Sequence, residues 1–75
     1  MMFGLGKQRS AFGRFLDRNG ITQQELSKAS GVNRNSISRI TQSDENKPSM
    51  KNASKLIKAL KNAGYNVDYD DFWSM

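Results

Sequence analysis

The segment between Arg34 and Arg39 carries side chains that could hydrogen-bond to a ligand, and no carboxylate interrupts them. Arginine can donate two hydrogen bonds to guanine and asparagine can pair similarly with adenine, each pair giving about 1–3 kcal/mol of discrimination between bases. The candidates for base recognition are Arg34, Asn35, Ser38 and Arg39. Two structural alternatives remain: Asn35 could help to cap a helix, and Arg39 could bind phosphate or stay solvated.

These residues must be presented by the second of two short helices that the stretch from Thr22 to Thr41 predicts. Thr22 and Glu25 have the spacing of a capping box that begins the first helix, and Gly31 can end it in the left-handed conformation. Asn33 is a good cap for the second helix, which we expect over about residues 33–41. The side chains expected to face inward are Leu26, Ala29, Ser30, Ile37 and Ile40, with the small Ser27 at the tight turn.

A further helix is expected before this pair, over about residues 10–18. Phe12, Phe15 and Leu16 have the spacing of one helical face, and Gly13 is expected to weaken the helix by about 1 kcal/mol. The two rings could form a platform for stacking bases. We interpret them as core, because a domain this small has few other side chains to bury there.

The strongest amphipathic pattern lies between Ser49, a plausible N-cap, and Gly64, a plausible stop. Its inward stripe is expected to comprise Met50, Ala53, Leu56, Ile57 and Leu60. The lysines on its opposite face are interpreted as solvated, with phosphate contact mainly at the first turn. The polar segment before this helix, residues 42–48, ends in the only proline and predicts a loop.

Composition narrows the possible functions. The 75 residues make one domain and include neither cysteine nor histidine, which removes the usual metal ligands and the commonest general base, so we expect no enzyme, cofactor or metal.

All 12 basic residues but only 4 of the 7 acidic ones lie in residues 1–64. This basic body suggests a polyanionic partner, nucleic acid before membrane, although many basic proteins bind neither. Without a signal peptide or a spanning segment, a soluble cytoplasmic protein is expected.

The last eleven residues have a different character from the body, with three aspartates and four aromatic side chains. Asp68 could cap a last helical turn with Asp71 at its third position. We expect the apolar side chains of this tail either to close the core or to form a dimer contact, with core closure preferred. They are Tyr65, Val67, Phe72 and Trp73.

The twenty-residue unit from Gln23 to Gln42, with Gly31 at its turn, resembles the helix-turn-helix of the phage repressor and Cro type, also called XRE-like. Within it, Ile37 and Ile40 match the two apolar sites of the recognition helix. The resemblance covers residues 10–64 and includes the later Pro48-Ser49-Met50 and the pair Ala59-Leu60. The segments FGLGK and DDFW also look like those of small bacterial or phage regulators.

The resemblance implies a compact all-α fold of four to five helices, with an irregular arm at residues 1–9 and the tail at residues 65–75. It also implies that the recognition helix enters the major groove of double-stranded DNA, with Arg34, Asn35, Ser38 and Arg39 at base edges. Phosphate contacts are expected from Gln23, Asn33, Ser36, Asn46, Lys47, Lys51 and Asn52.

One helix reads too few base pairs to select a genomic site, so a homodimer on a palindromic operator is expected. The expected output is repression of transcription, although activation through a polymerase contact is an alternative. No membrane and no small-molecule ligand is expected as a partner. A second class of function is a protein-interaction module, such as an antirepressor or an antitoxin, with the tail as its binding surface.

Two departures from the family pattern lie near the recognition helix. Ser27 stands where the family usually has alanine, and it remains small enough for the helices to cross. The acidic residue and glycine that often follow the recognition helix are replaced by Gln42 and Ser43, and the loop contains Asp44 and Glu45. These two carboxylates would repel a phosphate backbone unless they point away from it.

Overall fold

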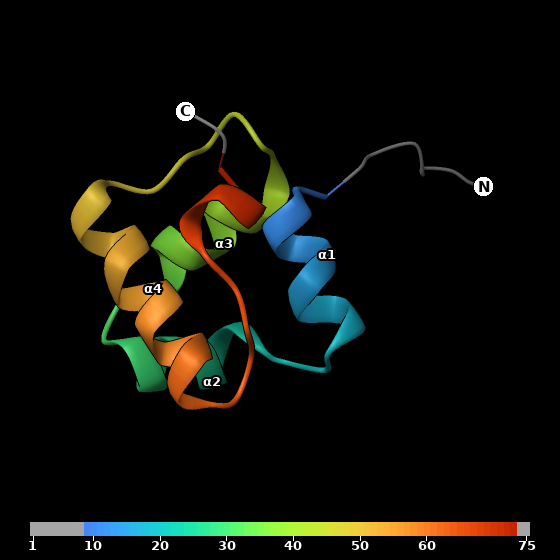
Figure 1. The fold of residues 1–75 in the computed structure, drawn as a ribbon. Helices are drawn as coiled ribbons and strands as arrows, with labels where there is room; N and C mark the ends of the chain where they lie inside the picture. The colour runs from blue at the N-terminus through green and yellow to red at the C-terminus, as the bar shows by residue number, and fades with distance from the viewer. Residues whose placement is uncertain (1–8, 74–75) are drawn as a thin grey trace.

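The computed structural model describes residues 9–73, which form four α-helices and one short 3-10 helix and contain no β-strand. The elements are α1 (Ala11–Arg18), α2 (Gln23–Ser30), α3 (Arg34–Gln42), α4 (Met50–Asn62) and the 3-10 helix η1 (Tyr69–Asp71). α3 packs against α1 and α2, α4 packs against α2, and η1 lies on α4 (Figure 1). The predicted all-α fold is therefore confirmed. The predicted irregular arm lies outside the described residues, apart from Arg9.

Thr22, Asn33 and Ser49 are the caps that the sequence predicted for α2, α3 and α4, and Ser10 is the cap of α1. The Ser10 and Ser49 hydroxyls accept hydrogen bonds from the backbone amides three residues later, and Asn33 Oδ1 accepts one from the Asn35 amide at 2.7 Å. At α2 the capping box is complete: Thr22 Oγ1 accepts from the Glu25 amide at 3.0 Å, and the Thr22 amide donates to Glu25 Oε1 at 2.9 Å. Hydrogen bonds from the Thr22 amide and hydroxyl favour the charged carboxylate and lower the pKa of Glu25.

Two serine hydroxyls fix the turn between α2 and α3. Gly31 ends α2 with a φ of 78°, in the left-handed region that favours glycine. Ser27 Oγ donates to the Val32 carbonyl at 2.7 Å, while Ser30 Oγ donates to the Leu26 carbonyl and accepts from the Val32 amide. The serine at position 27 is thus small enough for the crossing, and it also adds a hydrogen bond that an alanine could not form. These bonds tie α2 to Val32 in the turn.

The start of α1 lies tightly against the end of α3. The Ser10 amide donates to the carbonyl of Thr41 at 3.0 Å, and both residues are buried. At Gly13 a Cβ atom would lie only 2.5 Å from the same carbonyl oxygen. Gly13 therefore permits the close approach of the two helices, a packing role that its helix propensity alone does not reveal.

Most of the stripe residues expected for the four helices are buried or partly buried, and two are exposed. Leu26, Ile37, Ile40 and the buried face of α4 form one cluster with Phe12 and Leu16. The prediction for Ala29 was wrong, because it is exposed at the edge where α2 meets the far end of α4. The prediction for Met50 was also wrong: as the first residue of α4 it lies beyond the core and is 66% exposed.

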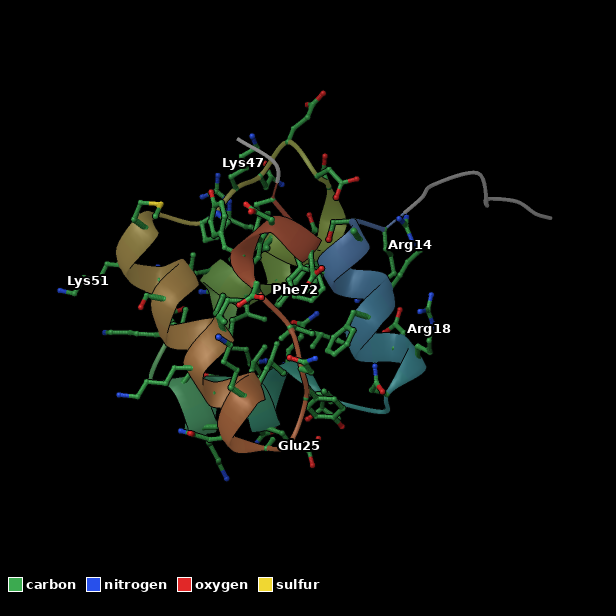
Figure 2. The ribbon with its side chains drawn as sticks, viewed as in Figure 1. Arg14, Arg18, Glu25, Lys47, Lys51 and Phe72 are labelled. Atoms are coloured by element: carbon green, nitrogen blue, oxygen red, sulfur yellow. The ribbon has the colours of Figure 1, made fainter. Side chains whose placement is uncertain are left out.

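The tail returns across the domain between α4 and α1 (Figure 1). Val67 and Trp73 are buried in the core cluster, whereas Tyr65 and Phe72 are partly buried against it. Trp73 and Phe72 pack on Phe12 with ring centroids 5.1 and 5.0 Å away, and Phe72 lies between η1 and α1 (Figure 2). The tail therefore completes the core on the side of α1 and α4.

Candidate nucleic-acid interface

α3 presents one face to the core and the opposite face to solvent. Ile37, Ile40 and Thr41 are buried. On the other face Asn35 and Arg39 are exposed, Ser38 is half-buried between them, and Arg34 is exposed at the start of the helix. The four side chains expected to read bases therefore share the accessible side of one short helix, with no carboxylate on that helix.

A polar hollow of about 570 Å³ borders the beginning of α3. It is lined by Arg34 together with Gln23 and Gln24 from the first turn of α2, and by Arg9 and Asp17 from the α1 region. Arg9 Nε lies 2.8 Å from Asp17 Oδ2 in an exposed ion pair. One flank of the exposed face is thus lined by the Arg34 guanidinium, two amide side chains and the Arg9–Asp17 ion pair.

Gln23 extends from α2 towards the end of α3. Its Nε2 atom lies 3.4 Å from Oγ1 of the buried Thr41, whose hydroxyl donates to the Ser38 carbonyl at 2.8 Å. This contact connects the start of α2 to the recognition helix. Gln23 therefore has a structural contact in addition to the phosphate contact expected from the sequence.

A second hollow, of about 380 Å³, borders the other flank of α3. Its lining brings together the following residues from α3, the loop and the first turn of α4: Ser36, Arg39, Asn46, Lys47 and Asn52. Five predicted ligands of phosphate or bases thus surround one depression, although they are up to sixteen positions apart in the sequence. Lys51, by contrast, is exposed and points outward from α4 beside this hollow (Figure 2).

Two of the asparagines have defined structural partners. Asn46 Nδ2 donates to the Arg39 carbonyl at 2.9 Å and so holds the loop against the end of α3. Asn33 supplies the cap of α3 through Oδ1, whereas Asn35 contributes only its backbone amide to that cap. The side chain of Asn35 is therefore not the cap, which was the structural alternative for this residue.

The two carboxylates of the loop, Asp44 and Glu45, lie in different environments. Asp44 Oδ1 accepts a hydrogen bond from the Ala11 amide at 2.9 Å, so this carboxylate lies at the positive end of the α1 dipole. Glu45 lines the hollow next to Arg39 and Lys47. Of the two carboxylates expected to repel a phosphate backbone, only Glu45 therefore lies in the hollow beside α3.

Gln42 belongs to the exposed face of α3 but was absent from the sequence-based set. It is exposed, and its Nε2 atom lies 3.5 Å from Ser38 Oγ. Its spacing of three residues from Arg39 and seven from Asn35 is the signal that could have identified it, since such residues share a helical face. It was overlooked because the helix was expected to end at about residue 41.

No helix within residues 9–73 is long and apolar enough to cross a membrane. No match is found among curated proteins or among solved structures. The family model described as helix-turn-helix matches residues 14–62, which is more than half of the chain and contains both α2 and α3. The chain therefore belongs to the helix-turn-helix family of the XRE and Cro type, a family of DNA-binding domains that act in transcriptional regulation and are typically not enzymes.

Proposed function

We propose that the protein is a small transcriptional regulator that binds double-stranded DNA in a sequence-specific way and represses transcription by occupying an operator. The observation that carries this proposal is the exposed, carboxylate-free face of α3 with a polar hollow on each flank. A helix with its side chains is about 10–12 Å across, which suits the roughly 12 Å width of the major groove. The flanking hollows then face the two phosphate backbones.

The contacts divide into base recognition and backbone positioning. Arg34 and Asn35, nearest the start of α3, read the bases first, and Ser38 and Arg39 follow one turn later. Arg39 also borders the hollow that contains Lys47, so it can bind phosphate instead. The backbone contacts come from Gln23 on one flank and, on the other, from Asn33, Ser36, Asn46, Lys47, Lys51 and Asn52.

A homodimer on a palindromic operator completes the proposal, with half-sites about 34 Å apart. Val67 and Trp73 are buried within each copy, so the partly exposed rings of Tyr65 and Phe72 are the parts of the tail that can contribute to a dimer contact. Sedimentation of the protein alone and on a two-site duplex measures this assembly. A single copy on a duplex that carries both half-sites would contradict it.

Selection of bound duplexes from random DNA, followed by titration of variants, tests the proposal. Arg34→Ala and Asn35→Ala should each weaken binding to the selected operator by about 1–3 kcal/mol and leave affinity for random DNA largely unchanged. Lys55→Ala is the matched control for lost charge, since Lys55 is exposed on α4 and lines neither hollow beside α3. Equal losses on operator and random DNA would contradict the assignment of these residues to base recognition.

The competing function, a protein-interaction module such as an antirepressor or antitoxin, makes a different prediction about salt. A DNA-binding protein that neutralises several phosphates loses affinity steeply as salt rises, because each contact releases counterions. A module that does not use DNA would show no such salt-dependent affinity. A reporter gene placed downstream of the selected operator then separates repression from activation.

A further inference from the structure

An apolar hollow lies between α4 and η1, and it shares no residue with the two hollows beside α3. Its volume is about 430 Å³. Such a volume lies within the range of roughly 300–1,000 Å³ that is typical of ligand clefts. Its lining includes Ala53, Ile57 and Tyr69, with Met50, Lys58 and Lys61 exposed around it. We refer to this hollow as the α4 groove.

Met50 makes the α4 groove unusual on this surface. Within residues 9–73 it is the one large apolar side chain that is exposed, at 66%. It lies at the first turn of α4, outside the cluster of buried core residues. Methionine is flexible and polarisable, and it is common at surfaces that adapt to a protein partner.

Lysines outnumber carboxylates among the residues that line the α4 groove, which include Lys58, Lys61 and Asp68. α4 contains no acidic residue, and its four lysines are exposed: Lys51, Lys55, Lys58 and Lys61. Lys61 Nζ lies 3.0 Å from Asp68 Oδ1, but both side chains are more than half exposed. Exposed pairs of this kind contribute little to stability, so an incoming carboxylate can replace Asp68 at small cost.

We propose that the α4 groove binds an acidic protein segment that carries large apolar side chains, such as an amphipathic helix with carboxylates beside its apolar stripe. The apolar side chains would cover Met50 and Ile57, and the carboxylates would pair with Lys58 and Lys61. A second copy that docked through its own α4 fits poorly, because it would place lysines against lysines. DNA fits poorly as well, because its backbone would leave Met50 uncovered. The groove shares no residue with the proposed DNA contacts on α2, α3, the loop and the first turn of α4, so the partner and DNA can bind together.

Titration of the isotope-labelled protein with designed peptides, followed by NMR, tests the proposal. The probe is a synthetic amphipathic peptide with leucine and phenylalanine at helical spacing and glutamate elsewhere. One control peptide has lysine in place of glutamate, and another has serine in place of the apolar residues. Only the first peptide should shift the resonances of Met50, Ile57 and Tyr69.

Three variants locate the site. Met50→Ser should weaken peptide binding by about tenfold, because it removes a large apolar contact from an exposed position. Lys58→Glu should weaken it by several-fold, whereas Lys55→Glu, with the same change of charge outside the groove, should weaken it less. Binding to the DNA operator should be unchanged by Met50→Ser. This last result separates the groove from the proposed DNA function.

Four results would overturn the proposal. Equal binding of the lysine peptide, or equal weakening by Lys55→Glu and Lys58→Glu, would show that the groove does not select an acidic apolar partner. Shifts at the groove that depend on the concentration of the protein alone would identify a second copy as the occupant. Shifts at the groove on addition of a DNA duplex would assign the lysines to phosphate contact instead.

Discussion

Replacing Gly13 by alanine sets two physical effects against each other. In an isolated helix, alanine stabilises the helical conformation by about 1 kcal/mol relative to glycine, so helix propensity alone predicts a more stable protein. In this fold the added Cβ would lie 2.5 Å from the Thr41 carbonyl oxygen, against 3.4 Å for the start of ordinary contact. The helices would have to separate by most of this 0.9 Å difference, because the contact is with backbone rather than with a flexible side chain.

The net magnitude follows from three contributions. Overpacking of this kind costs about 1–3 kcal/mol. Separation of the helices would also strain or break the 3.0 Å hydrogen bond from the Ser10 amide to the Thr41 carbonyl, which is worth about 0.5–1.5 kcal/mol. After the gain in helix propensity of about 1 kcal/mol, Gly13→Ala should destabilise the protein by about 1–3 kcal/mol. For a domain of this size Tm should fall by roughly 5–20 °C.

Urea and thermal unfolding followed by circular dichroism measure this difference. Arg18→Ala is the matched control, because Arg18 is an exposed residue of the same helix and its replacement should change stability by no more than about 0.5 kcal/mol. Figure 2 shows Arg18 pointing away from the domain. An unchanged or higher Tm for Gly13→Ala would refute the inference that the α1–α3 approach requires glycine.

Two further predictions concern stability. Glu25 has its pKa lowered by the Thr22 hydrogen bonds, so its contribution to stability is present above the unfolded pKa of 4.5 and is lost as pH falls through the lower folded value. Glu25→Gln should therefore lose less stability than the wild type when urea unfolding is repeated at decreasing pH, and identical pH profiles would exclude this carboxylate as the cause. Trp73→Ala should cost about 3–5 kcal/mol, since it removes a fully buried indole, and a loss below about 1 kcal/mol in urea unfolding would contradict the role of the tail in the core.

The helices could be predicted from the sequence because their starts depend on local chemistry. A cap such as Ser10 or Ser49 bonds to an amide three residues away, so both partners are visible in one short stretch. The spacing of apolar residues identified the face of each helix that points towards the core. It did not show whether another element covers that face along the whole length of the helix. Met50 and Ala29 have the right spacing and yet lie past the edges of the packed region.

The candidate interface could be predicted only in part, for a related reason. The exposed face of α3 follows from the positions of Ile37 and Ile40, which also fix the directions of the remaining side chains. The two hollows depend on residues brought together by tertiary packing. The partner of Asp44 is 33 residues away in the sequence, and no local pattern could indicate that its carboxylate caps α1.

The burial of Trp73 also makes its intrinsic fluorescence a probe of the folded state. The chain contains a single tryptophan, which is 1% exposed and packs against the rings of Phe12, Tyr69 and Phe72. Its emission should therefore report the docking of the tail against α1 and α4, while circular dichroism reports the helices. Coincidence of the two unfolding curves would establish that the tail and the helical body melt as one cooperative unit.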